Sequence, residues 1–306
     1  MVDLHTHSRA SDGALSPAEL LTLAARKGVK AVALTDHDTI DGVQAAYEAS
    51  LQLGLGFIPG VEIEIEFSPG EFHLLGLGID PENDHLVHAL NSLAKTRQRR
   101  NKNILLRFRE AGIRLDMDEI EAAAGTSRIG RPHIADALVR QKIVRNRQEA
   151  FDKYLAKGKP FYLSKDCLEL EDAIAIIREA GGVSVVAHPY SLFVSKSKLS
   201  ELMDEWKVLG VDGVEGYHSA AKLGQCRILE QMGRQRGFLI TAGSDYHNEI
   251  KPECGIGHTA GGIEISDSFY TELLSRLPQL KPLEVLEQAQ GLSGAQGLSG
   301  TERADN

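Results

Sequence analysis

Short apolar runs alternate with amphipathic segments over the first 80 residues of the chain. Residues 2–4, 30–35, 56–67 and 72–79 have the composition of buried strands. A helix is predicted to begin at Pro17, because Ser16 and Glu19 form a capping box around a proline at the first helical position. That helix should end near Gly28, and a second should cover residues 41–53. The alternation of strand and helix predicts a parallel α/β sheet or barrel.

The pattern changes at residue 81 and returns at about 166. Residues 81–165 lack strand patterns and are rich in Arg, Gln and Asn, which predicts an α-helical insertion. Beyond it, strands are expected at 183–187, 211–215 and 238–242, and helices at 170–180, 198–209 and 220–236. About seven strand–helix units result, as in a (β/α) barrel short of eight. We therefore expect a barrel from residues 1–80 and 166–285, and a tail, 286–306, that is disordered because it has no hydrophobic period.

Composition places the 306-residue chain among cytoplasmic proteins. Its hydrophobic content of 42% is ordinary, and no apolar run reaches the roughly 20 residues of a membrane helix. The first residues have neither the basic nor the apolar part of a secretory signal. Cys167, Cys226 and Cys254 include no CxxC pair and indicate neither a disulfide framework nor a zinc cage. We expect no membrane partner, and no obligate protein partner is evident.

Charge is divided unevenly along the chain. The formal net charge is -9, yet residues 95–165 contain 18 Lys and Arg against 8 Asp and Glu. A basic run of this kind is either a solvated helical face or a surface that binds polyanions. The chemistry of the remaining chain favours the second interpretation.

Histidines and acids gather where predicted strands end. Active sites of α/β barrels form at the C-terminal face, so residues distant in sequence converge there. Imidazole and carboxylate suit Mn, Zn or Fe, and no cysteine contributes. A single His-x-His or Asp-x-His would be weak evidence, but five such elements in barrel order predict a metal cluster. Its ligands are expected to be His5, His7, Asp12, His37, Glu62, His73, His188, Asp245 and His247.

These residues lie in motifs that resemble those of the PHP superfamily, named for polymerase and histidinol phosphatase. The motifs are DLHTH (3–7), SDG (11–13), TDHD (35–38), GVE (60–62), AHP (187–189) and GSDYH (243–247). The resemblance covers about residues 2–260. SRASDG (8–13), FHLLGLGID (72–80) and the insertion make the chain most similar to the branch with nucleoside 3′,5′-bisphosphate phosphatases and a bacterial 5′-to-3′ exoribonuclease.

The resemblance implies a distorted (β/α)7 barrel and two or three divalent metals, usually Mn²⁺, with Zn²⁺, Fe²⁺ and Mg²⁺ also compatible. It assigns Asp245 with Glu62 and the His-x-His pair to the first metal, and Asp12 to the third. Asp12 stands where related proteins often have His, which could weaken the third site. In full, the implied sets are His5, His7, Glu62 and Asp245; Glu62, His73 and His188; and Asp12, His37 and His247.

Residues outside the cluster offer substrate contacts. Arg131 and His133 lie in a predicted loop before a helix in the insertion, where guanidinium and helix dipole both favour phosphate. The alternative is a solvent-facing turn. His218 follows a predicted strand and is expected to contact substrate or a ligand. Asp36 and Asp38 flank a ligand and either orient imidazoles or cap turns. His85 and His88 are expected at the surface, and His258 is expected to be structural.

The expected reaction is phosphate-ester hydrolysis by a metal-bridging hydroxide, with Glu62, Asp245 and His188 carrying catalysis. A nucleoside 3′,5′-bisphosphate or the end of a short 5′-monophosphorylated RNA would suit a basic insertion beside a metal face. Two alternatives remain open: a monoesterase similar to histidinol phosphatase, and a non-catalytic nucleic-acid-binding module stabilised by metals.

Overall fold

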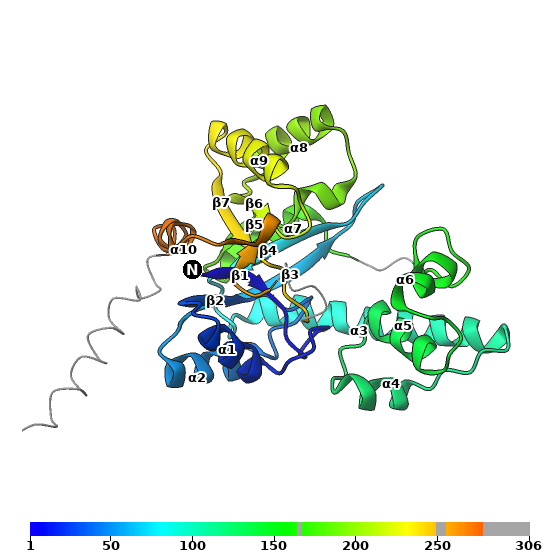
Figure 1. Cartoon of the computed structure of the whole chain (residues 1–306). Coiled ribbons are helices and arrows are strands. Elements are labelled where there is room, and N and C mark those ends of the chain that lie inside the picture. Colours follow the sequence, from blue (N-terminus) through cyan, green and yellow to red (C-terminus); the bar gives the residue numbers. More distant parts are fainter. Residues whose placement is uncertain (164–166, 249–254, 278–306) are drawn as a thin grey trace, which may run out of the picture.

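A computed structural model describes residues 1–163, 167–248 and 255–277 and places seven strands in one curved sheet (Figure 1). The two edges meet: the N–H of His7 donates to the carbonyl of Tyr246 at 3.0 Å, and the N–H of Asp245 donates to the carbonyl of His5 at 2.9 Å. The sheet is therefore a nearly closed barrel, and the mixed α/β fold predicted from the sequence is confirmed. In sheet order the strands are β1 (Asp3–Thr6), β2 (Ala31–Leu34), β3 (Gly56–Ile65), β4 (Phe72–Leu77), β5 (Val183–Val186), β6 (Gly213–His218) and β7 (Leu239–Gly243).

The direction of β4 departs from the parallel arrangement that the sequence suggested. β4 runs antiparallel to β3 and to β5, while the other neighbouring pairs are parallel. Residues 66–71 connect β3 to β4, and a parallel connection needs about a dozen residues or more. The expectation of parallel strands is wrong here. As a consequence, the N-terminal end of β4, which carries His73, lies at the edge where the parallel strands have their C-terminal ends.

Helices cover the outside of the barrel. The capping box predicted for the first helix is present, because Ser16 Oγ accepts from the N–H of Glu19 and the Glu19 carboxylate accepts from the N–H of Ser16. A short hairpin, β8 (His258–Thr259) and β9 (Ile263–Glu264), follows β7. The barrel helices are α1 (Pro17–Arg26), α2 (Val43–Leu53), α7 (Leu170–Glu179), α8 (Lys196–Leu209), α9 (Leu223–Gln235) and α10 (Asp267–Leu274).

Between β4 and α7 the chain forms a helical lobe beside the barrel (Figure 1). Its helices are α3 (Asp84–Glu110), α4 (Met117–Ala124), α5 (Arg131–Arg140) and α6 (Arg147–Ala150), followed by one π-helical turn, Phe151–Leu155.

The long helix α3 takes part in two hydrophobic cores. Leu86, Leu90 and Leu93 belong to the barrel core, while Ile104 and Phe108 belong to a separate core within the lobe. The first half of α3 therefore packs as part of the barrel, although residues 81–165 are expected to form the insertion. These domain limits stay a prediction. The expected tail, 286–306, and the last barrel residues, 278–285, lie outside the described residues.

Candidate metal centre

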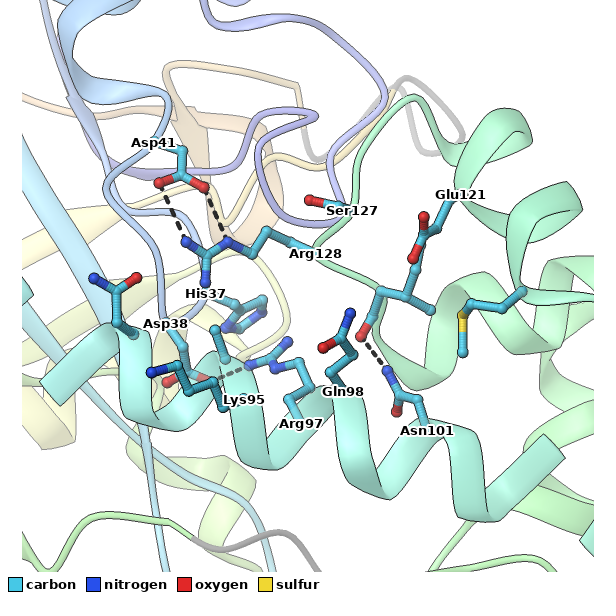
Figure 2. A pocket seen from close by; sticks show the side chains of 14 residues that line it. His37, Asp38, Asp41, Lys95, Arg97, Gln98, Asn101, Glu121, Ser127 and Arg128 are labelled. Carbon is cyan, nitrogen blue, oxygen red and sulfur yellow. Dashed lines mark hydrogen bonds and ion pairs between the residues drawn. The ribbon is translucent and has the colours of Figure 1, made fainter. Parts of the chain in front are cut away.

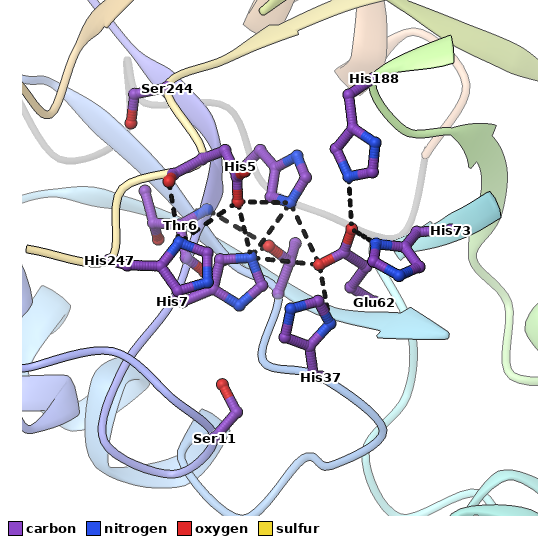
Figure 3. Close-up of polar contacts among 12 residues, drawn as sticks. His5, Thr6, His7, Ser11, His37, Glu62, His73, His188, Ser244 and His247 are labelled. Carbon is purple, nitrogen blue, oxygen red and sulfur yellow. Dashed lines mark hydrogen bonds and ion pairs between the residues drawn. The ribbon is translucent and has the colours of Figure 1, made fainter. Parts of the chain in front are cut away.

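Glu62 stands at the centre of a ring of imidazoles at the strand ends (Figure 3). Its side chain is fully buried, as are those of His5 and His7. Oε1 lies 2.9 Å from His73 Nδ1 and 3.0 Å from His188 Nε2. Oε2 lies 3.0 Å from His37 Nδ1, 3.1 Å from His7 Nε2 and 3.4 Å from His5 Nε2.

Neighbouring groups fix which nitrogen of His188 faces Glu62. The Ser191 hydroxyl donates to the carbonyl of Glu71 at 2.8 Å, so its oxygen accepts a hydrogen bond from the Nδ1–H of His188 at 2.9 Å. Nε2 of His188 then faces the carboxylate of Glu62 at 3.0 Å.

His5 and His247 are held in the same way. Nδ1 of His5 lies 3.0 Å from the Glu215 carboxylate, and Nδ1 of His247 lies 2.9 Å from the backbone carbonyl of Asp245. Carboxylates and carbonyls only accept, so both Nδ1 atoms carry protons. Nε2 of each ring is directed at the cluster, that of His247 at 3.2 Å from Asp12. Such outer hydrogen bonds are how proteins commonly orient metal-ligating histidines.

The nine predicted ligands come together, and the donor atoms of eight of them form three overlapping groups. Two groups resemble the expected first and third metal sites. The second differs, since it contains His37 in place of His188, although His188 contacts the same Glu62 oxygen as His73. The groups are His5, His7, Glu62 and Asp245; His37, Glu62 and His73; and His7, Asp12, His37 and His247. Which residues bind which metal stays a prediction.

Buried atoms at the centre of the cluster fit a bound cation. Glu62 Oε2 has no hydrogen-bond partner, although three imidazole nitrogens surround it, and His7 Nδ1 also has none. Nε2 of His5 and Nε2 of His7 approach to 3.1 Å. Two ligands about 2.1 Å from one metal at right angles lie about 3 Å apart, so these spacings match metal coordination. The arrangement supports binding of divalent metals.

In the metal-free protein, the charges of the cluster determine where protons reside. Burial lowers the pKa of His73, but the nearby charge of Glu62 outweighs it and raises that pKa to about 9. Burial is likewise outweighed at His247, where Asp12 and Asp245 raise the pKa to about 10. At His37, burial dominates and lowers the pKa to about 3. His37 is thus a neutral ligand, whereas metals must displace protons from His73 and His247.

Two buried acids that the sequence analysis did not single out hold the ligands in place. Glu215 pairs with His5 and also accepts from the backbone N–H of His188 at 2.7 Å. Asp3 accepts from the N–H of Ser244 at 3.0 Å and of Gly257 at 2.7 Å. Asp3 thereby ties β1 to the loop that carries Asp245. Asp3 is the first residue of β1 and Glu215 lies inside β6, so the strand-end pattern that identified the ligands did not include them.

The two acids flanking His37 have other roles than orienting imidazoles. Asp36 accepts from the hydroxyls of Ser8 and Ser11, both at 2.6 Å, and so holds the loop that carries Asp12. Asp38 forms an ion pair with Arg97 of the lobe.

His218 contacts a predicted ligand. Its Nδ1 accepts from the N–H of Ala220 at 3.2 Å, so its Nε2 donates to Asp245 Oδ2 at 3.3 Å. His218 also lines a cavity beside the cluster. The geometry supports orientation of Asp245. Of the other histidines, His85 and His88 are exposed, and Nδ1 of His258 lies 3.1 Å from the carbonyl of Ile256.

The lobe presents arginines to the cluster across a pocket of about 240 Å³, which we call the arginine pocket. Arg131 and His133 line it, and their contact with substrate stays a prediction. Nδ1 of His133 accepts from the N–H of Gly130 at 2.9 Å, which leaves its Nε2 as the proton donor. The remaining lining residues include three more arginines, cluster residues and two further acids: Arg97, Arg100, Arg128, Asp12, His37, His73, Glu64 and Glu71.

Two of these arginines are already neutralised by the barrel. Arg97 pairs with Asp38, and Arg128 pairs with Asp41 through contacts of 2.9 and 3.3 Å. Figure 2 shows His37 between the guanidinium groups of Arg97 and Arg128, in an adjoining pocket of about 260 Å³. These pairs fix the lobe against the metal-binding loops.

Arg100 and Arg131 have no carboxylate within ion-pair distance among the described residues. Arg100 is buried and donates to Asn101, and burial beside Arg97 and Arg131 lowers its pKa to about 10. Arg131 lies over the ring of Tyr162 at 5.3 Å. Clustered, unpaired guanidiniums favour an anion. The sequence analysis did not single out Arg97 and Arg100, although they lie in the basic run RQRR at 97–100. Their place in the arginine pocket becomes evident only from the structure.

Comparison with known proteins agrees with this geometry. The family model described as the PHP domain matches residues 3–163. The chain belongs to this family. The PHP chain is 32% identical to the 3′,5′-nucleoside bisphosphate phosphatase of Chromobacterium violaceum, over 92% of this chain and 99% of that protein. It is 34% identical to the 5′-3′ exoribonuclease of Haemophilus influenzae, over 80% of this chain and 89% of that protein.

A solved structure shares the fold of this PHP chain. It is a protein from Bifidobacterium adolescentis predicted to be a metal-dependent phosphoesterase, with a TM-score of 0.79 and 31% identity over 90% of this chain and 95% of that one.

A second cavity of the PHP chain, of about 660 Å³, adjoins the cluster on the side of α9, and we call it the aromatic cleft. His37, Glu71 and His73 line both this cleft and the arginine pocket. Its outer walls come from the segment after β5, from the connection between β6 and α9, and from α9, and they include Tyr190, Phe193, Val194, Ala220, Ala221, Gln225 and Leu229. Within the described ranges, no helix combines the length and apolar character needed to cross a membrane.

Proposed function

We propose that this chain is a metal-dependent phosphoesterase that hydrolyses the ester at the 3′ oxygen of a nucleotide carrying a 5′-phosphate. Its substrates are then nucleoside 3′,5′-bisphosphates and short RNAs with a 5′-monophosphate. The observation that carries the proposal is the arginine pocket, in which Arg100 and Arg131 lie across from Asp12, His37 and His73 of the metal cluster. The names of the two relatives, a bisphosphate phosphatase and a 5′-3′ exoribonuclease, support it.

The pocket suits the phosphate that is not cleaved. Arg100 and Arg131 remain free to pair with an anion, whereas Arg97 and Arg128 are engaged with Asp38 and Asp41. Charge-assisted bonds from guanidinium to phosphate are stronger than neutral hydrogen bonds. A 5′-phosphate held here would leave the 3′-phosphate of the same nucleotide at the cluster. His133 adds an Nε2 proton donor on the same side.

Within the cluster, residues of this chain divide the work. Divalent metals, when bound, lower the pKa of a water nucleophile and stabilise charge on the phosphoryl oxygens. Glu62 belongs to two of the ligand groups, with Oε1 near His73 and Oε2 near His37, and Asp245 completes one of these groups. His188 is held by Ser191 with Nε2 toward Glu62, and His218 holds Asp245 by Oδ2. The His and carboxylate donor set suits Mn²⁺, in two or three sites, with Asp12 in the third.

The alternatives fit the surroundings of the cluster less well. A monoesterase similar to histidinol phosphatase has no second phosphate to place against Arg100 and Arg131. A module stabilised by structural metals would enclose them, because structural sites are coordinatively closed. Here cavities of about 240 and 660 Å³ reach ligand residues from two sides.

The direct test measures hydrolysis by the purified chain after treatment with EDTA and after addition of Mn²⁺. The substrates are adenosine 3′,5′-bisphosphate, adenosine 3′-monophosphate and a 5′-phosphorylated RNA trinucleotide, with inorganic phosphate and mononucleotide release measured separately. We expect Mn²⁺-dependent turnover, with kcat/KM for the bisphosphate well above that for the 3′-monophosphate. Absence of metal-dependent turnover on all three substrates would overturn the proposed function. Equal kcat/KM for the two mononucleotides would remove the assigned role of the arginine pocket.

A further inference from the structure

The aromatic cleft contains an exposed aromatic residue in an unusual backbone conformation. Phe193 has 78% of its surface exposed and a φ of 52°, in the left-handed region that bulky residues seldom adopt. It directly follows a 3₁₀ turn, Pro189–Leu192, that begins after the predicted ligand His188. Exposed apolar area and a strained backbone both need a compensating role, and at binding sites they often have one.

The turn that carries Phe193 is held rigidly beside the cluster. The Tyr190 hydroxyl donates to the backbone carbonyl of Gln225 at 3.0 Å, which ties the turn to α9. Ser191 bonds to both His188 and the carbonyl of Glu71. The backbone that leads into Phe193 is therefore held next to His188.

The cleft and the arginine pocket extend from the cluster toward different elements. Residues of α3 and α5 line the arginine pocket, and residues of α9 line the cleft. Figure 1 shows α9 and the lobe helices on different sides of the barrel. None of the described residues lining the cleft is a lysine or an arginine. The cleft is thus suited to an aromatic, uncharged group, and a volume of about 660 Å³ is in the range of small-molecule sites.

We propose that the aromatic cleft binds the nucleotide downstream of the cleaved bond, with its base stacked on Phe193. This inference rests on the proposed function and deepens it, because a nucleoside bisphosphate has no downstream nucleotide and an RNA chain does. In both substrates water adds to the phosphorus of the 3′-phosphate, the bond from phosphorus to O3′ breaks, and O3′ takes a proton. With RNA, the phosphate remains on the downstream nucleotide in the cleft and becomes the 5′-phosphate of the shortened chain.

The geometry assigns each part of an RNA end to one cavity. The 5′-phosphate of the terminal nucleotide lies against Arg100 and Arg131, and the scissile phosphate lies at the cluster. The next base enters the cleft, which needs no positive charge because the phosphate of that nucleotide is the scissile one. Stacking on an aromatic ring is tolerant of base identity, as a stepwise exonuclease requires.

The test compares Phe193→Ala with wild type on two substrates in Mn²⁺, a 5′-phosphorylated dinucleotide and adenosine 3′,5′-bisphosphate. Loss of base stacking should lower kcat/KM for the dinucleotide by about 5-fold to 150-fold, and much less for the bisphosphate. Phe193→Trp should retain the preference for the dinucleotide. Val208→Ala, at an exposed apolar residue of α8 outside the cleft lining, is the matched control and should change neither substrate.

A substrate change makes the assignment specific. For the wild type, removing the downstream base of the dinucleotide should lower kcat/KM as much as Phe193→Ala lowers it on the normal dinucleotide. For the Phe193→Ala variant, removing that base should cause no further decrease in kcat/KM. A second readout is independent of turnover: a non-hydrolysable dinucleotide with downstream 2-aminopurine should be quenched on binding wild type, and not on binding Phe193→Ala.

Three outcomes contradict the inference. If Phe193→Ala lowers kcat/KM equally for the bisphosphate and the dinucleotide, the base stacked on Phe193 is the terminal one and not the downstream one. Unchanged kcat/KM for the dinucleotide would remove Phe193 from the site. Additive losses from the abasic substrate and the variant would show that the ring and the base do not meet. Each leaves the proposed function intact if wild type still hydrolyses the bisphosphate, whereas a wild type inactive on both substrates overturns both proposals.

Discussion

Glu215 Oε1 lies 3.0 Å from His5 Nδ1, and both side chains are almost completely buried. Because the carboxylate can only accept, it holds the proton on Nδ1 and directs Nε2 of His5 toward Glu62 and Asp245. The fold brings the two residues together, because Glu215 lies in β6 and His5 lies in β1.

Glu215→Gln should weaken metal binding by about 10-fold to 100-fold, the usual effect of losing an outer partner of a ligand. The amide of Gln can donate to Nδ1 and so permit the wrong tautomer of His5. Titration of the metal-free protein with Mn²⁺ measures the change. The unfolding midpoint in EDTA serves as the control for folding, and unchanged metal affinity would show that Glu215 does not orient His5.

Glu62→Gln should abolish turnover and lower the metal content of the purified protein. The Glu62 carboxylate belongs to two of the three ligand groups. The substitution replaces one of its oxygens by an amide nitrogen, which cannot bind a metal. Bound metal is measured by elemental analysis beside hydrolysis of the bisphosphate. Full activity with unchanged metal content would exclude Glu62 from the cluster.

Asp12→Asn should have a milder effect and empty only one site. Asp12 belongs to a single group, with His7, His37 and His247. The metal content should fall by about one equivalent, while the tightest-bound metals remain. If all metals are lost together, the division of the ligands into groups is wrong.

Arg131→Ala should raise KM for a 3′,5′-bisphosphate by about 10-fold to 100-fold, as expected when a charge-assisted contact of about 1.5–3 kcal/mol is lost. A nucleoside 3′-monophosphate lacks the second phosphate and should respond much less. Arg145→Ala is a matched control, because the Arg145 side chain is 88% exposed and pairs only locally with Glu149. Equal losses on both substrates would indicate that Arg131 acts on the reacting phosphate or on folding.

Metal affinity should rise with pH between about 6 and 8, and binding should release protons. In the metal-free protein, carboxylates outweigh burial and raise the pKa values of His73 to about 9 and His247 to about 10, so both rings are protonated at neutral pH. A metal must displace those protons, and fewer have to be displaced as pH rises toward these values. Calorimetry in buffers of different ionisation enthalpy counts the protons. Affinity independent of pH would contradict protonation of these rings.

Sequence patterns anticipated which histidines and acids the structure brings together, because these residues obey a simple rule of barrels. Ligands stand at strand ends, and His5, His37 and His188 could be placed there from apolar runs alone. The direction of β4 was missed, although the short connection 66–71 carried the information. His73 lies at the start of β4 and not at its end. It still reaches the cluster, because β4 runs antiparallel to its neighbours.

The arginine pocket could be predicted only in part. Arg131 and His133 stood out beside a helix start, but Arg97 and Arg100 are two of many basic residues on α3, and sequence alone does not tell which side of a helix faces the barrel. The pairs Arg97–Asp38 and Arg128–Asp41 are contacts between distant segments, which depend on how the lobe packs on the barrel. Phe193 gave no sequence signal, since its exposure and its φ arise from the turn that follows His188.

Arg97 and Arg100 occupy the stretch of α3 between the part that packs in the barrel core and the part that packs in the lobe core. They contribute to neither core, and none of the metal ligands lies on that helix. Substitution of Arg100 can change the anion that is recognised while the hydrolytic centre and both cores stay intact, whereas Arg97 is tied to Asp38 beside a predicted ligand. The same barrel could in this way acquire new substrates in evolution by small steps along one helix, without passing through an inactive or unfolded ancestor.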